Sequence, residues 1–167
     1  QVYEGVVYMD FDRQRERVIE GLPCYAYEPL DPALLPPLYV AYHDALSEPT
    51  EVFHNNIRER FNRGEAPVVD AMRHFADLAA QGREALLARD AERLARLVDE
   101  NFDTRRSIYR LPSWQVEMVD AARRTGASAK FAGSGGAIIG TYRGDAQLDE
   151  VRRVLSALGS QTLKPLV

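Results

Sequence analysis

The spacing of apolar residues changes along this chain, and the order of the changes constrains the fold more than any single motif. Residues 2–11, 24–30 and 37–45 are short stretches with aromatic and β-branched residues, which predicts strands. From Thr50 onward the apolar residues recur at helical spacing. The last third then follows the order helix, strand, glycine loop, strand, helix, strand. This order predicts an α+β fold in which an antiparallel sheet has helices packed on one face.

The change of spacing also predicts an internal boundary. We expect residues 1–48 to form a strand-rich segment and residues 49–167 to form an α+β domain. Asp90 is a candidate N-cap for the third helix of the middle block. The predicted core-facing stripes of the three helices are Val52, Phe53, Ile57 and Phe61; Met72, Phe75, Ala76 and Ala79; and Leu94, Ala95, Leu97, Val98 and Phe102.

In the last third, a helix over 114–124 has Ser113 as a candidate cap and Gly126 just past its end. Strands are predicted over 128–132 and 137–142, on either side of the glycines. A helix then ends at Gly159, before a final strand over 162–167. Its predicted core-facing residues are Leu148, Val151, Leu155 and Leu158.

Composition excludes several classes of protein. The chain has 167 residues, of which 46% are hydrophobic and 28% charged, as in a globular domain, and its formal net charge is −4. An acidic balance argues against binding nucleic acid or an anionic membrane, and no apolar run approaches the ~18 residues of a membrane span. The lone Cys24 indicates a reducing compartment, so the cytoplasm is the expected location. The chain starts at Gln1 without an initiator Met, which is typical of a cut N-terminus.

Three glycines lie together in Gly133-Ser134-Gly135-Gly136, between the two predicted strands. Successive backbone N–H groups in such a loop can form a concave nest for a phosphate oxygen. The loop is not a Walker loop, because no Lys-Ser or Lys-Thr follows it. A plain turn between strands is the alternative. Lys130 is a candidate cation near the nest, or else a solvated surface lysine.

Other candidate sites are weaker. His43, His54 and His74 have no metal-ligand spacing, so no metal site is expected. No G-x-S-x-G nucleophile elbow occurs, which argues against a hydrolase. The adjacent Arg105 and Arg106, with Asn101, lie near a predicted helix end, where cations either complement the helix dipole or bind an anion.

Several segments in order resemble the C-terminal portion of a GHMP-family sugar kinase. They are "QVYEGVVYMDF", "YEPLDPALLPPLYVAY", "NFDTRRSIY" and "EMVDAARRTGASAKFAGSGGAIIG". The most specific block is Asn101 to Gly140. Within the family the chain is most similar to the glucuronokinases, and next to the heptose kinases. The resemblance implies the family's C-terminal, ferredoxin-like fold.

The resemblance also implies a function. In these kinases a C-terminal glycine-rich loop shapes the phosphate and sugar pocket, which assigns Gly133, Ser134, Gly135 and Gly136. Arg105, Arg106, Asn101 and Lys130 are the candidate substrate-binding residues. The implied reaction transfers a phosphoryl group from ATP to a sugar, giving a sugar 1-phosphate and ADP, with Mg²⁺ on the nucleotide phosphates.

The family's nucleotide loop, "P-x-x-x-G-L-S-S-S-A", does not occur here, and its catalytic aspartate would fall before Gln1. We therefore assign no catalytic base, expect the chain to be inactive alone, and expect an N-terminal half as its partner. Without that half, the hydrophobic strand predicted at residues 2–11 would be uncovered, so we expect the chain to form a dimer. The alternatives are a non-catalytic ligand-binding or interaction module and a kinase for another sugar, such as a heptose.

Overall fold

The computed structural model describes residues 5–43 and 50–166, without the side chains of residues 13 and 50–55. The chain divides into two compact units, residues 1–35 and residues 36–166. No helix in the described part of the chain is both long and apolar enough to cross a bilayer.

The first unit consists of two antiparallel strand pairs. β1 (Val6–Asp10) pairs with β4 (Ala26–Leu30), and β2 (Arg17–Ile19) pairs with β3 (Leu22–Cys24). Glu20 and Gly21 connect β2 and β3 with positive φ angles of 51° and 81°, as a two-residue hairpin turn requires. The predicted strands at 2–11 and 24–30 are present in part, and residues 2–4 lie outside the described residues. The β2–β3 hairpin was missed. The sequence clues to it are the β-branched Val18 and Ile19, followed by Gly21.

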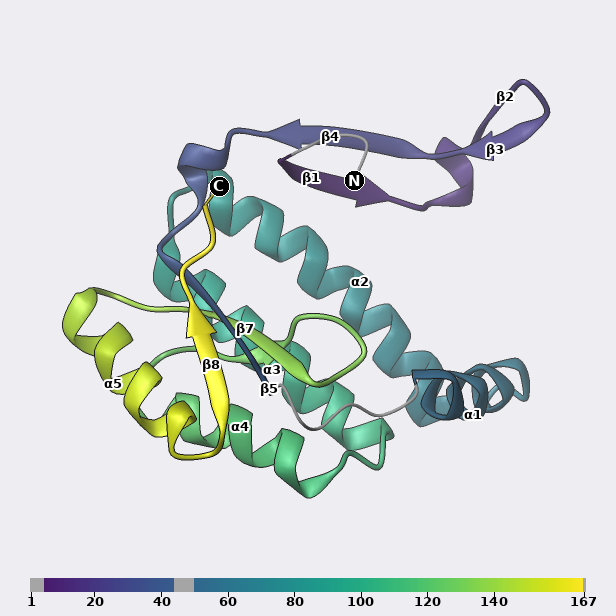
Figure 1. Ribbon diagram of the computed structural model, residues 1–167. Helices are drawn as coiled ribbons and strands as arrows, with labels where there is room; N and C mark the ends of the chain where they lie inside the picture. The colour runs from purple at the N-terminus through teal and green to yellow at the C-terminus, as the bar shows by residue number, and fades with distance from the viewer. Residues whose placement is uncertain (1–4, 44–49, 167) are drawn as a thin grey trace. The chain divides into compact units, whose positions relative to one another are not determined.

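The second unit contains a four-stranded antiparallel sheet (Figure 1). The order is β6 (Lys130–Phe131), β7 (Ala137–Thr141), β5 (Leu38–His43) and β8 (Ser160–Leu163). β5 is an inner strand, because it pairs with β7 on one side and β8 on the other. The final strand, β8, runs from Ser160 to Leu163, whereas the prediction was residues 162–167.

The described residues of this unit form five α-helices: α1 (Thr50–Asn62), α2 (Ala66–Leu87), α3 (Ala91–Ile108), α4 (Ser113–Arg124) and α5 (Asp145–Ser156). The main core joins the sheet to α3, α4 and α5. Its largest fully buried side chains include Tyr39, Phe102, Met118, Ile138 and Leu155. The prediction of an α+β fold, with an antiparallel sheet and packed helices, is confirmed.

Most of the predicted helix ends are confirmed. The carboxylate of Asp90 accepts a hydrogen bond from Arg93 N (2.8 Å) and caps α3. Gly126 and Gly159, with φ of 82° and 76°, follow the last turns of α4 and α5. The cap at Ser113 is wrong, because Ser113 is already the first residue of α4 and Pro112 holds the cap position.

The predicted stripes are confirmed on α3 and α5 and are partly wrong on α1 and α2. On α1, Ile57 is buried but Phe61 is exposed, and the side chains of Val52 and Phe53 lie outside the described ones. The core face of α2 is Val68, Ala71, Leu78 and Ala85, so the predicted Ala76 and Ala79 are exposed. Several small residues along α2 make its periodicity ambiguous, and packing selects the face.

Candidate functional site

The glycine loop connects β6 to β7 and is held at its ends by backbone hydrogen bonds. Ala132 N donates to Ala137 O (2.9 Å), and His43 N, at the end of β5, donates to Gly136 O (3.2 Å). Gly135 and Gly136 have φ angles of 149° and 77°, which other residues rarely adopt. The loop conformation therefore depends on glycine at these two positions.

Gly135 also packs directly on a buried polar side chain. A β-carbon at Gly135 would lie 2.6 Å from Gln115 Oε1 and 2.8 Å from its Nε2. Gln115 is in the first turn of α4 and is buried. By contrast, a β-carbon at Gly133 would have no heavy atom within 4 Å. The loop thus has a packed part at Gly135 and an open part at Gly133.

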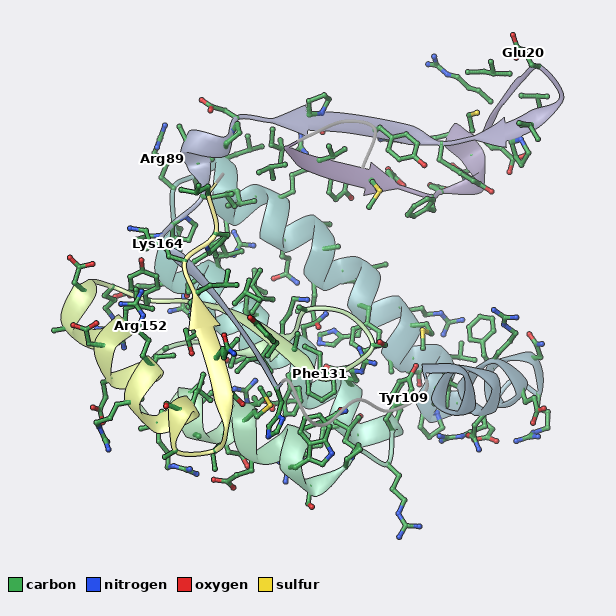
Figure 2. The ribbon with its side chains drawn as sticks, viewed as in Figure 1. Glu20, Arg89, Tyr109, Phe131, Arg152 and Lys164 are labelled. Atoms are coloured by element: carbon green, nitrogen blue, oxygen red, sulfur yellow. The ribbon has the colours of Figure 1, made fainter. Side chains whose placement is uncertain are left out.

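Arg105, from the last turn of α3, reaches the same loop. Its Nη1 donates to Gly133 O (2.8 Å) and its Nη2 donates to Ser134 O (2.9 Å). The guanidinium carbon lies 5.1 Å from the ring centres of both Tyr109 and Phe131, which are labelled in Figure 2. Burial lowers the pKa of Arg105. The loop carbonyls and the two rings compensate for burial of this charge.

Lys130, on β6, is the second cation beside the loop. Its Nζ donates to Phe131 O (3.1 Å). Burial lowers the pKa of Lys130, and the positive charge of Arg105 lowers it further. The two cations repel each other at the loop end of the sheet, so a bound anion here would be favourable.

The other two candidate residues are placed differently. Arg106 is exposed, and its Nη1 lies 3.8 Å from Asp120 Oδ1 on α4. Arg106 also lines a separate cavity of about 410 Å³ with Tyr109 and Leu111. Asn101 is half-buried on α3, about one turn before Arg105. The structure thus brings Arg105, Lys130 and the loop together, and directs Arg106 towards α4.

Sequence reasoning missed Gln115. The available clue was its position in a helical stripe with Met118, Val119 and Ala122, where a polar residue among apolar ones needs an explanation. Sequence reasoning also missed the ring contacts of Arg105, since Phe131 comes from a distant strand.

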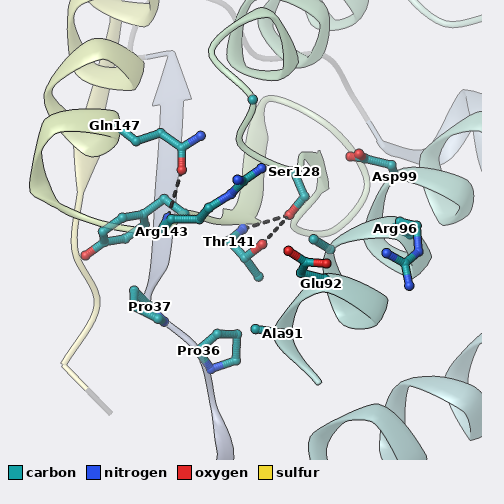
Figure 3. Close-up of a pocket in the computed structure, with 13 residues that line it drawn as sticks. Pro36, Pro37, Ala91, Glu92, Arg96, Asp99, Ser128, Thr141, Arg143 and Gln147 are labelled. Atoms are coloured by element: carbon teal, nitrogen blue, oxygen red, sulfur yellow. Dashed lines mark hydrogen bonds between the residues drawn. The ribbon is translucent and has the colours of Figure 1, made fainter. Parts of the chain in front are cut away.

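A cavity of about 500 Å³ lies at the opposite end of β7 (Figure 3). It is lined by the first turns of α3, with Glu92 and Arg96, and by Arg143 beyond β7. Its polar groups include Ser128 Oγ, 2.8 Å from Thr141 Oγ1. None of the predicted site residues lines it, so the candidate site is the glycine loop with its two cations.

Comparison with known proteins identifies the domain. The family model described as "GHMP kinases C terminal" matches residues 83–161. Glucuronokinase 1 of Arabidopsis thaliana is 39% identical over 143 residues, which cover 83% of this chain and 38% of that protein. Probable glucuronokinase 2 of the same plant is 40% identical over 144 residues, with the same coverage. The chain therefore spans less than half the length of these relatives.

Solved structures share the fold at lower identity. A Lin0012 protein from Listeria innocua superposes with a TM-score of 0.73 at 18% identity, covering 83% of this chain and 41% of that one. The L. major mevalonate kinase in complex with R-mevalonate gives a TM-score of 0.70 at 21% identity, covering 90% and 48%. These structural similarities show the shared fold. The family match shows that residues 83–161 form a GHMP kinase C-terminal domain.

Proposed function

We propose that this chain supplies the glycine loop and part of the sugar pocket of an ATP-dependent sugar-1-kinase that acts on glucuronate. The products would be glucuronate 1-phosphate and ADP. The observation that carries the proposal is the 39% identity to a glucuronokinase over a region that includes the loop and both cations. The rest of the enzyme, including the nucleotide loop and the catalytic base, would come from a polypeptide segment outside residues 1–167.

The chemistry around the loop suits an anionic group. Phosphoryl transfer depends mainly on positioning and on neutralising the charge of the phosphoryl oxygens. Backbone N–H groups of residues 133–136 would approach such an oxygen, with Lys130 as the nearby cation and with Arg106 and Asn101 as candidate sugar contacts. Open space at Gly133 supports close approach of a ligand.

Mg²⁺ would help neutralise the charge of the ATP phosphates. It prefers carboxylate and water oxygens. The cations and peptide groups around this loop do not match that preference. In the proposal, the Mg²⁺ ligands therefore lie in the other part of the enzyme.

The lone Cys24 is a free thiol, which supports a reducing compartment, and we propose that the protein is located in the cytoplasm.

The first unit supports an N-terminal half as partner. It exposes large apolar side chains, namely Met9, Phe11, Val18, Ile19, Leu22 and Tyr27. Large exposed apolar side chains can mark a surface that another polypeptide covers. We propose that the N-terminal half covers them in the complete kinase, and that the chain alone dimerises through them. Size-exclusion chromatography with hydrophobic-dye binding tests this, and a monomer that binds no dye would contradict it.

Activity assays test the proposed function. The chain alone, with ATP, Mg²⁺ and glucuronate, should release no ADP, whereas the complete kinase should form glucuronate 1-phosphate in preference to a hexose or heptose 1-phosphate. Gly133→Ala in the complete kinase should lower kcat/KM ~10- to 100-fold, because the new methyl group blocks ligand approach. The stability should stay within ~0.5 kcal/mol of wild type, because the methyl group contacts nothing in the protein.

Gly82→Ala, in the interior of α2 and away from the loop, is the matched control and should leave the kinetics unchanged. Full activity of Gly133→Ala would contradict a ligand at the loop. Phosphorylation of no sugar by the complete protein would instead favour a non-catalytic module.

A further inference from the structure

We propose that Arg105 is a positioning residue, which orients the peptide groups of the glycine loop and does not itself bind the sugar carboxylate or the transferred phosphoryl group. The inference rests on the proposed function for its reaction, but its geometry stands on contacts within this chain. The sequence made Arg105 a candidate substrate-binding residue, whereas in this proposal it orients the loop.

The guanidinium of Arg105 is already engaged. Its two terminal nitrogens donate to Gly133 O and Ser134 O, at 2.8 and 2.9 Å. Tyr109 and Phe131 lie near it, with ring centres 5.1 Å from Cζ. Its Nε is buried and donates to no acceptor in the described part of the chain. A bidentate carboxylate needs two parallel N–H groups on one edge of the guanidinium. Because both terminal nitrogens already donate to the loop and Nε is buried, a carboxylate would have to compete with these contacts.

These two hydrogen bonds fix the direction of the neighbouring N–H groups. In a planar trans peptide, the C=O of one residue and the N–H of the next point in opposite directions. The carbonyls of Gly133 and Ser134 face Arg105, so the N–H groups of Ser134 and Gly135 point away from it. The donors proposed to meet a phosphate oxygen therefore lie on the far side of these peptide groups from the guanidinium.

The charge of Arg105 adds to this orientation. A cation on the carbonyl side of a peptide group polarises it and strengthens its N–H as a donor. Arg105 can thus assist an anion through two peptide groups without touching it. A point-charge ammonium cannot reproduce a fork of two N–H donors directed at two carbonyls, so lysine is a poor substitute at this position.

Kinetics of the complete kinase distinguish positioning from direct binding. For Arg105→Lys and Arg105→Ala we expect kcat to fall ~10- to 100-fold, by the same factor on glucuronate and on a neutral hexose, with KM for glucuronate within ~3-fold of wild type. Methylguanidinium should partly restore kcat of Arg105→Ala by occupying the vacated position beside the rings of Tyr109 and Phe131. Arg124→Ala, an exposed arginine of α4 that pairs with Glu117, is the control and should not lower kcat in this way. A large rise in KM for glucuronate alone would overturn the proposal, since Arg105 would then bind the carboxylate.

A second measurement does not require activity. In ¹H–¹⁵N spectra of this chain, Arg105→Lys should shift or broaden the amide signals of Ser134, Gly135 and Gly136, and leave those of α5 and β8 in place. Arg106→Ala should leave the loop signals unchanged. Unperturbed loop amides in folded Arg105→Lys would overturn the positioning role. Absence of kinase activity in the complete wild-type protein would count against the proposed function only. It would not count against the positioning role of Arg105 that the amide signals report.

Discussion

The side-chain amide of Gln115 lies against the Cα atom of Gly135, where a β-carbon would be only 2.6 Å from Gln115 Oε1. Gly135 also has a φ of 149°, which is unfavourable for any residue with a side chain. Gly135→Ala should therefore lower the free energy of unfolding by about 1–3 kcal/mol. Gly133→Ala in the same loop should change it by less than ~0.5 kcal/mol. Urea unfolding of the two variants measures the difference.

A double-mutant cycle separates the two causes of the loss at Gly135. Gln115→Ala removes the clashing amide, so it should recover part of the stability lost in Gly135→Ala. The part that remains reports backbone strain at positive φ. If the stability losses of the two single variants simply add in the double variant, the contact with Gln115 does not contribute to the loss at Gly135.

Gly140 of β7 allows the segment before β6 to approach β7 closely. A β-carbon there would overlap the backbone oxygen of Ser128 and would lie 2.8 Å from Tyr39 Cε1. Gly140→Ala should cost more than about 4 kcal/mol and abolish cooperative unfolding, because a backbone atom cannot move aside as a side chain can. Circular dichroism during thermal unfolding measures this.

Gly82→Ala is the control for Gly140→Ala. Gly82 is in the interior of α2, and its added β-carbon would meet only Leu94 Cδ1 at 3.9 Å. We expect it to stabilise the chain by up to about 1 kcal/mol, since alanine is the better helix former. Similar losses for the two variants would contradict the close approach at Gly140.

Arg123 of α4 joins α3 to the segment before β6. It donates to Asp103 Oδ1 (2.7 Å), Asp99 O (2.6 Å) and Ala129 O (3.1 Å), and its Cζ lies 5.1 Å from the ring centre of Phe102. Arg123→Met should cost about 2–4 kcal/mol in urea unfolding, because partly buried acceptors lose their donors.

The neighbouring Arg124 provides a control for Arg123. Its side chain is 63% exposed and pairs with Glu117 on the surface of α4 at 2.7 Å. Arg124→Met should cost less than about 1 kcal/mol. Equal effects at both positions would show that the contacts of Arg123 with α3 contribute little to stability.

The lowered pKa of Lys130 predicts how the stability of the chain changes with pH. Burial, and then the charge of Arg105, lowers the pKa of Lys130 in the folded chain below its ordinary value of 10.5. Between the two pKa values the unfolded chain binds more protons, so this residue makes stability rise as the pH increases. Wild type should therefore gain stability relative to Lys130→Met from neutral pH towards 10.5. Urea unfolding across this range checks it, and a difference that decreases would contradict the lowered pKa.

The sequence by itself determined the features that depend on a few neighbouring residues. Asp90, Gly126 and Gly159 mark helix ends because capping and positive φ act over one turn. The stripe on α5 was predictable because its apolar spacing has one interpretation. The β6–loop–β7 segment was equally clear, since three glycines between two apolar runs predict a loop between strands. These local features, in order, were enough to indicate the α+β fold.

Tertiary structure decided the pairings and the roles of side chains. The sequence does not show that β5 lies between β7 and β8, because the pairing partners are about a hundred residues apart and depend on the packing of the whole sheet. The sequence placed Arg105 beside a helix end. The fold directs its guanidinium to carbonyls 28 and 29 residues later, near the rings of Tyr109, just after α3, and of Phe131 in β6. A long side chain has many rotamers of similar energy, and only contacts with distant segments select one of them.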